Sequence, residues 1–299
     1  MTTQTNDFTY NTEHLSMELT EFANSTHNHE DLKKTLNFIA PAIPVARRFE
    51  YKKAATDQFF STEEDDIRAT GSNFKYMDFQ GESITAKTLN KGLGVRVDVD
   101  DINGKDWPMR YVYFLQEQIY RNELRRVIKA LIANASDGGK LTWTEKASPD
   151  TDIRKALMAA CKKNGFYPNR ILYSEPAWFI RQDCYAGQDT AGARIAAQMS
   201  RETVAEFLRV DSVQLLKQNN LGIQGQLKDN SVFAFYAEDS MFKDALSNLK
   251  YFVTLSPEGH FFRVYLVEQP KYTDIIVECF STIAVTSKTN LIHWTVQGA

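Results

Sequence analysis

Residues 92–100 read Gly92-Leu93-Gly94-Val95-Arg96-Val97-Asp98-Val99-Asp100 and lead, across a short polar break, into the strongest helical pattern of the chain. Val95, Val97 and Val99 alternate with charged residues, a pattern typical of a strand with one buried and one exposed face. We therefore predict a strand over this stretch, with the three valines on its buried face.

The pattern that follows predicts a helix of about 30 residues. Its apolar residues recur at helical spacing and are Tyr120, Leu124, Val127, Ile128, Leu131, Ile132 and Ala135. Asp106 and Pro108 are start signals, and Ser136-Asp137-Gly138-Gly139 is predicted to stop the helix. Such a helix would be about 45 Å long, which suits a structural support.

The region before the helix is predicted to be an extended loop with two arms. It starts at Arg47-Arg48-Phe49-Glu50-Tyr51, turns at an acidic run and returns through residues 92–100. A hairpin of about 50 residues with so few large aliphatic side chains cannot bury a core of its own. It must lie against another surface, and we expect that surface to belong to a neighbouring subunit.

Two short amphipathic patterns precede the loop and predict an N-terminal arm. Their apolar residues are Leu15, Leu19 and Phe22, then Leu32, Leu36 and Ile39. The polar stretch 24–29 separates the two patterns, and Pro41 and Pro44 prevent the second from continuing as helix.

The segment after the long helix alternates between helical and strand-like patterns, which predicts a mixed α/β unit over residues 140–275. Helices are predicted at 149–163, 176–181 and 201–209, and strands at 170–173, 213–216 and 231–237. The last quarter is strand-like at 263–267, 274–279, 282–285 and 291–296. Residues 286–290 are predicted to join the last two of these strands as a hairpin.

Composition excludes several classes of protein. With 299 residues and 43% hydrophobic content, the chain can bury a substantial core. A net charge of −3 gives the whole chain no electrostatic reason to wrap nucleic acid, so any such contact must be local. No apolar run approaches the ~20 residues of a membrane span, and the N-terminus lacks the parts of a signal peptide. We expect the protein to stay in the cytoplasm where it is made.

Motifs with a known chemical mechanism are missing, so we predict no catalytic, cofactor-binding or metal-binding residue. Gly92 and Gly94 precede a strand, whereas a dinucleotide-binding loop precedes a helix. His27 and His29 lie in a polar break that we interpret as a solvated loop, while His260 and His293 are interpreted as packing residues. The three cysteines, which are far apart, are predicted to be reduced and buried: Cys161, Cys184 and Cys279.

Residues in the extended loop are candidates for contacts between subunits. The acidic run Glu63, Glu64, Asp65 and Asp66 is predicted to be solvated or to pair with Lys and Arg of a neighbour, which would guide assembly. Phe74 and Tyr76, on the returning side of the loop, are further candidates for such contacts.

A basic stripe, Arg121, Arg125 and Lys129, falls at i, i+4 and i+8 beside the apolar face of the long helix. One interpretation is a solvated flank whose charges pair with Glu117 and Glu123. The other is a surface that meets phosphate groups without reading sequence. The residues alone leave both open.

This order of elements resembles the major capsid proteins of tailed bacteriophages, which share the Hong Kong 97 fold. Short stretches that resemble the family are Asp57-Gln58-Phe59-Phe60 before Arg68-Ala69-Thr70-Gly71-Ser72, residues 92–98, and Arg121-Asn122-Glu123-Leu124. The resemblance implies an α+β chain, divided into an N-terminal arm (1–46), an extended loop (47–105), a peripheral domain with a spine helix (106–139), an α/β axial domain (140–275) and returning peripheral strands (276–299).

The same resemblance implies a virion capsid assembled in the host cytoplasm, with pentamers and hexamers of this chain forming an icosahedral shell. Each loop would lie over a neighbouring subunit, and the basic stripe on the spine would meet packaged double-stranded DNA. Family members with a built-in scaffold carry about a hundred extra residues, so we expect a separate scaffolding protein here, with a portal and in some cases a decoration protein. No cofactor and no membrane contact are expected.

Two rivals stay open. An encapsulin-type nanocompartment shell would need a cargo-docking surface near the N-terminus, for which Leu15, Leu19 and Phe22 are candidates. An α/β enzyme of another kind would need a cleft within residues 140–275, for which the candidates are Tyr173, Glu175, Trp178 and Arg181.

Overall fold

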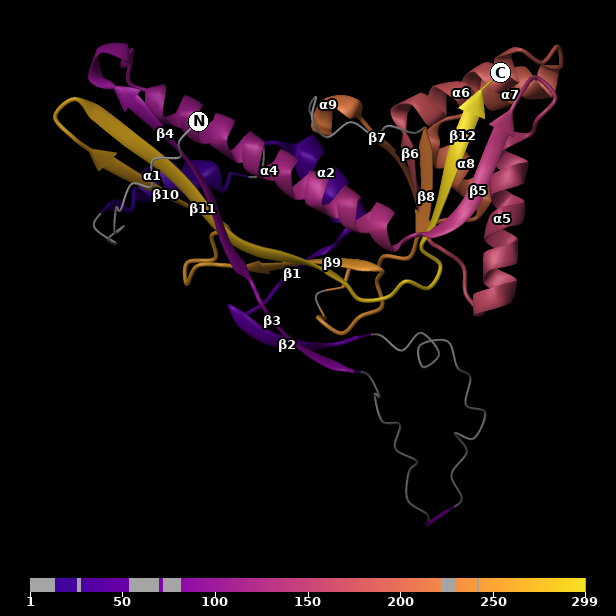
Figure 1. The fold of residues 1–299 in the computed structure, drawn as a ribbon, viewed down its shortest axis with the longest axis horizontal. Coiled ribbons are helices and arrows are strands. Elements are labelled where there is room, and N and C mark those ends of the chain that lie inside the picture. Colours follow the sequence, from indigo (N-terminus) through magenta and orange to yellow (C-terminus); the bar gives the residue numbers. More distant parts are fainter. Residues whose placement is uncertain are drawn as a thin grey trace.

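The computed structural model describes residues 14–25, 28–53, 70–71, 82–221, 230–240 and 242–298. They form two five-stranded sheets, a two-stranded hairpin and one long helix that lies beside the first sheet (Figure 1). The second sheet, with the helices that cover it, lies at the other end of the molecule. The chain is therefore an α+β protein, as predicted.

The first sheet is built around β11 (Tyr272–Val285). One edge of β11 pairs antiparallel with β4 (Leu89–Asp98), and the other edge pairs with β10 (Phe262–Glu268) and then β9 (Leu249–Thr254). The short strand β1 (Ala42–Pro44) adds to β9 in parallel. We predicted two strands, 274–279 and 282–285, and this was wrong, because Phe280 and Ser281 continue the pairing with both β4 and β9.

Strand β4 confirms most of the predicted alternation. Val97 is buried and Val95 is half-buried, while Arg96 and Asp98 are exposed. Val99 departs from the prediction: it begins a 3-10 turn, Val99–Asp101, and is 47% exposed. The strand ends because the Asp98 carboxylate accepts a hydrogen bond from the Asp100 N–H, which turns the backbone out of the extended conformation.

The long helix is α4 (Trp107–Asn134), which begins close to the predicted Asp106 and Pro108. Its buried face packs on β11 and β4, and on two N-terminal helices, α1 (Met17–Ala23) and α2 (Glu30–Ile39). Of the predicted apolar residues, Leu124, Val127 and Leu131 are fully buried, whereas Ile132 is 43% exposed. Across the described ranges, α4 included, no helical stretch is both long and apolar enough to span a bilayer.

The end of α4 differs from the prediction. Ala135 takes an extended conformation, and Ser136 then starts a strand, β5 (Ser136–Trp143), without an intervening turn. Gly138 is needed for packing in this strand, because a Cβ atom there would collide with the indole ring of Trp294. The glycine pair that we interpreted as a helix stop therefore serves the neighbouring strand.

The second sheet has the order β5-β12-β8-β6-β7, with β6 (Arg170–Ser174), β7 (Ser212–Leu216), β8 (Ser231–Phe235) and β12 (Ile292–Gly298). One face lies under α5 (Pro149–Asn164), α6 (Glu175–Ala186) and α8 (Arg201–Leu208). The opposite face packs toward α2, through contacts such as that between the rings of Phe38 and Phe235. Two short helices complete this part: α7 (Ala191–Gln198) and α9 (Gln218–Leu221).

The C-terminal hairpin that we predicted around residues 286–290 does not form. These residues lead from β11 in the first sheet to β12 in the second, where β12 pairs with β8 and β5. The linker is held by buried polar contacts, since the Asn248 side-chain amide donates to the carbonyls of Ser287 and Thr289. The sheets thus group the strands differently from the predicted segments 140–275 and 276–299, because β9 and β10 belong to the first sheet and β12 to the second.

Candidate functional surfaces

The extended loop begins and ends in a two-stranded hairpin, β2 (Arg48–Lys52) and β3 (Ser83–Lys87), which pairs antiparallel. Phe49 and Tyr51 on β2 pack on Phe252 of β9, with ring centroids 4.6 and 5.2 Å apart. The root of the loop is therefore supported by its own chain, where we had expected another subunit alone. The acidic run Glu63–Asp66, Phe74 and Tyr76 lie outside the described residues, so their predicted contacts stay predictions.

Two polar contacts fix this root to the segment before β9. The Lys52 N–H donates to Asp244 Oδ1 at 2.6 Å, and Lys243 Nζ donates to the Glu50 carbonyl at 2.6 Å. Lys250, buried in β9, donates to the carbonyl of Lys243 at 2.7 Å. Burial lowers the pKa of Lys250 to about 8, because its ammonium has left water without an ion-pair contact to a described carboxylate.

The basic stripe on α4 is partly neutralised within the chain. Arg121 forms an ion pair with Glu117 at 2.7 Å, as one interpretation predicted. Arg125 donates from Nε to the Leu221 carbonyl at 2.6 Å and from Nη1 to Asn122 at 2.9 Å, so it also fixes α9 to α4. Lys129 is exposed. The role of these three residues as a genome-facing surface stays a prediction.

Glu123 does not pair with the stripe, contrary to our interpretation. Its carboxylate is fully buried and accepts from Lys91 Nζ of β4 at 2.8 and 2.9 Å and from Arg126 Nη1 at 2.5 Å. Lys91 also donates to Ser281 of β11. A buried ion pair that is hydrogen-bonded on both sides fixes position more than it adds stability, so this network sets how α4 lies on the sheet.

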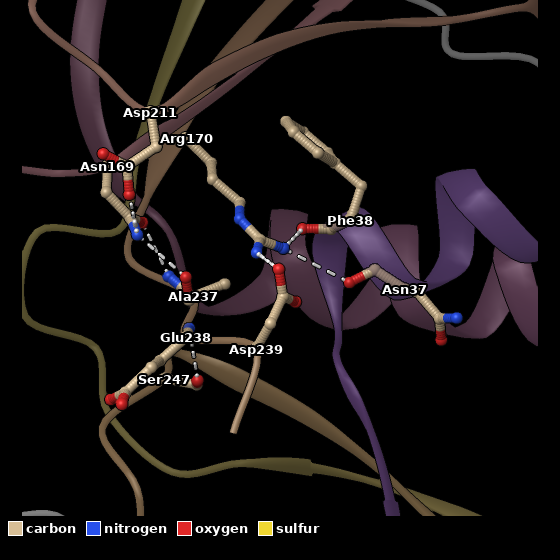
Figure 2. Close-up of polar contacts among 9 residues, drawn as sticks. All are labelled: Asn37, Phe38, Asn169, Arg170, Asp211, Ala237, Glu238, Asp239 and Ser247. Atoms are coloured by element: carbon tan, nitrogen blue, oxygen red, sulfur yellow. Dashed lines mark hydrogen bonds and ion pairs between the residues drawn. The ribbon is translucent and has the colours of Figure 1, made fainter. Parts of the chain in front are cut away.

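A buried arginine joins the N-terminal arm to the second sheet. Figure 2 shows Arg170, at the start of β6, with its guanidinium between the end of α2 and Asp239. Nη1 donates to the carbonyls of Asn37 and Phe38 at 3.3 and 2.8 Å, and Nη2 binds Asp239 at 2.6 Å. The carbonyls are the last acceptors of α2, which lack partners inside the helix. Arg170 therefore caps α2 with a side chain from another element.

Asn169 extends the same contact region (Figure 2). Its amide accepts from the Ala237 N–H and donates to the Ala237 carbonyl, both at 2.8 Å, and it also donates to Asp211. These bonds hold the linker that leads out of β8. Sequence reasoning missed both Asn169 and Arg170, because the groups that they bind are distant in the sequence.

The candidate cleft of the enzyme interpretation is part of the core. Tyr173 and Arg181 are fully buried and Trp178 is 6% exposed. Arg181 forms two hydrogen bonds with the buried carboxylate of Asp150, at 2.6 and 2.7 Å, and burial raises the pKa of Tyr173 well above its usual range. Glu175 accepts from the Gln218 N–H. Trp178 contacts both Tyr173 and Arg181, so these three side chains pack together in the core.

Histidines and cysteines mostly serve packing. His29, which we predicted to be solvated, is buried against Tyr113, and its Nε2 lies 2.9 Å from the Tyr113 carbonyl. His27 lies outside the described residues. His293 stacks on Phe233 with centroids 4.5 Å apart, as expected for a packing residue. All three cysteines are free, and burial raises the pKa of Cys279 to about 12. The described residues contain no group of side chains arranged to hold a metal ion.

The residues proposed for cargo docking are also used within the chain. Leu19 is 5% exposed and Phe22 packs against the same core, while Leu15 makes a β-bridge to Tyr265 of β10. The Asn24 side chain fixes α1 to the sheet, since it accepts from the N–H groups of Phe261 and Phe262.

No protein-family model and no curated protein matches the sequence. Solved structures do match the fold. A phage-related protein from Bordetella bronchiseptica RB50 has a TM-score of 0.64 at 15% identity, over 95% of this chain and 96% of that one. The capsid protein of cyanophage P-SCSP1u has a TM-score of 0.50 at 9% identity, over 87% of each chain.

An encapsulin, SrpI from Synechococcus elongatus PCC 7942, has a TM-score of 0.46 at 12% identity, over 85% of this chain and 84% of that one, and this likeness is too low to weigh. The arrangement of hairpin, long helix and two sheets agrees with the phage-related protein and with the cyanophage capsid. The chain has the fold of the major capsid proteins of tailed bacteriophages, the Hong Kong 97 fold.

Proposed function

We propose that this chain is the major capsid protein of a tailed phage, and that many copies assemble into an icosahedral head that encloses double-stranded DNA. The observation that carries the proposal is the hairpin β2–β3, whose described strands are fixed to their own chain at Phe252, Lys243 and Asp244. Residues 53–82 lie between these two strands. This stretch of sequence has few large aliphatic side chains with which to bury a core of its own, so a neighbouring copy is its natural support.

The rest of the architecture supports the same function. The ion-pair network of Glu123 and the Arg170 cap hold the long helix, the N-terminal helices and both sheets together. A shell subunit needs such a stable body, because its many contacts with other copies are individually weak. Pentamers and hexamers in the virion, assembled in the host cytoplasm with a separate scaffold, a portal and in some cases a decoration protein, follow from this proposal. The protein would then act without catalysis or a cofactor.

Contact with the genome is proposed for the exposed side of α4. Lys129 is exposed, and Arg121 retains a partly exposed guanidinium beside Glu117. With a net charge of −3, the chain would hold DNA only by such local basic surfaces. An encapsulin-type shell would lack this requirement, so the nucleic-acid content of purified particles distinguishes the two.

The hairpin provides the direct test. Replacing residues 54–81 by a short Gly-Ser turn keeps β2, β3 and β4, including Lys91, which a larger deletion would remove. We expect a folded protein with unchanged far-UV circular dichroism in the helical bands and no closed shells in electron micrographs. Normal shells from this variant would contradict the proposal.

A further inference from the structure

A cavity of about 530 Å³ opens on the outer side of the helices that cover the second sheet. It is lined by Arg154 and Met158 of α5, by Tyr167 just after that helix, and by Arg209 at the end of α8. None of these residues takes part in the hairpin, the basic stripe or the buried ion pairs described above.

The two guanidinium groups have no carboxylate partner among the described residues. Arg154 lies over the ring of Phe207 on α8, with its Cζ atom 4.8 Å from the centroid, which holds it across the gap between the two helices. Burial raises the pKa of Tyr167, while the charges of Arg154 and Arg209 act in the opposite direction. All three residues line the same cavity.

Arg209 occupies a position that usually holds glycine. Its φ is 57°, in the left-handed region, and the Val210 N–H reaches back to the Ala205 carbonyl at 3.1 Å, as in the common glycine-terminated helix end. A residue with a Cβ pays about 1 kcal/mol or more for this conformation. Because arginine rather than glycine occupies this position, we interpret the Arg209 side chain, which lines the cavity, as a functional group.

The stretch of sequence that includes most of the cavity lining is basic. Residues 153–169 contain Arg154, Lys155, Lys162 and Lys163 and no Asp or Glu. The last acidic residues before this run are Asp152 and Asp150, and Asp150 is buried in its ion pair with Arg181. Glu206 and Asp211 are close to Arg209 in the sequence, but neither forms an ion pair with Arg154 or Arg209 in the structure.

We infer that this cavity is an oxyanion site, in which Arg154, Arg209 and the Tyr167 hydroxyl bind a carboxylate or phosphate group. Guanidinium groups match the two oxygens of such an anion, and their hydrogen bonds to it are charge-assisted. This assignment rests on the proposed shell: we assign as occupant a carboxylate side chain of a second copy, because neither guanidinium has a carboxylate partner among the described residues of its own chain.

Binding is tested first with inorganic phosphate and with acetate. Melting temperatures of the full chain are measured against anion concentration, with chloride at matched ionic strength as the reference. The wild type should be stabilised saturably, and R154Q/R209Q should bind about tenfold more weakly or worse, the loss expected when charge-assisted hydrogen bonds are removed. The matched control is K155Q/K162Q, which loses the same charge from α5 outside the cavity and should behave like the wild type. Equal responses in all three proteins would overturn the oxyanion site.

Assembly then distinguishes the source of the oxyanion. If a second copy supplies a carboxylate, R154Q/R209Q should form fewer shells than K155Q/K162Q, and phosphate should slow assembly of the wild type beyond matched chloride. Normal assembly of R154Q/R209Q would overturn the second-copy occupant and leave free phosphate as the ligand. A wild type that never assembles would contradict the proposed function and this occupant together, while the melting experiment would still decide the oxyanion site.

Discussion

Lys91 on β4 and Glu123 on α4 form a buried ion pair, with Lys91 Nζ 2.8 and 2.9 Å from the two carboxylate oxygens. The pair connects two elements. One is strand β4, through which the extended loop returns, and the other is helix α4, which runs along the sheet. Ser281 on β11 accepts a third bond from Lys91, so three elements meet at one ammonium group. The position of the returning strand is thus specified by charge as well as by pairing.

Removing Lys91 should be strongly destabilising. In K91M, Glu123 would keep only Arg126, which is half exposed, and the buried carboxylate would lose its main partner. We expect a loss of about 3 kcal/mol in the free energy of unfolding, measured by urea denaturation. The double variant K91M/E123L should recover part of that loss, because it leaves no unpaired charge; a double variant as unstable as the sum of the single variants would argue against the coupling.

Arg170 should control how firmly α2 is held. R170M removes three hydrogen bonds and leaves the last carbonyls of α2 uncapped, which should lower stability by about 2–4 kcal/mol. R170K keeps the positive charge but loses the planar guanidinium with its several N–H donors, so it should recover little of the lost stability. Hydrogen exchange of the amides in residues 30–40 reports the effect locally. Unchanged exchange in R170M would mean that packing alone holds α2.

Lys250 gives stability a particular pH dependence. Its pKa is about 8 in the folded protein and near 10.5 in the unfolded chain, so the unfolded state binds more protons between these values. Stability should therefore rise by up to about 3 kcal/mol from pH 8 to 10.5 through this group. Cys279 acts oppositely above pH 9, because its pKa is raised to about 12. The difference between wild type and K250M isolates the lysine, and an equal pH profile in both would refute its role.

The basic stripe predicts a defect in genome retention. R121Q/R125Q/K129Q should assemble shells but lose packaged DNA more readily, with retention falling faster as salt rises. R125Q alone serves as the control, since it removes the contact with the Leu221 carbonyl and most of the charge remains. Equal retention in the triple variant and wild type would favour the interpretation as a solvated flank.

Local periodicity predicted most of the helices and strands. The faces of α4, α2 and β4 follow from the spacing of apolar residues. Gly165 ends α5 in the left-handed conformation, close to the end predicted at residue 163. The wrong predictions share a cause, since Gly138 and residues 286–290 have turn-like sequences. Their conformations are decided by Trp294 and Asn248, respectively, which are distant in the sequence. Tertiary contacts overrode local preference there.

The candidate surfaces were less predictable than the fold. Lys91, Arg170 and Asn169 lie in segments without a motif, and their importance depends on partners 32 to 190 residues away. Helical spacing predicted that Arg121, Arg125 and Lys129 lie beside the apolar face of the helix. The partner of Arg125 is a backbone carbonyl, which carries no sequence signal.

The central claim is that this chain assembles into closed shells. Purified protein, expressed alone and together with a scaffold candidate, would be separated by size-exclusion chromatography and imaged by negative-stain electron microscopy. We predict closed shells or rings of five and six subunits in at least one condition, with nucleic acid in the particles when DNA is packaged. A uniform monomer of 34.2 kDa in both conditions would contradict the account.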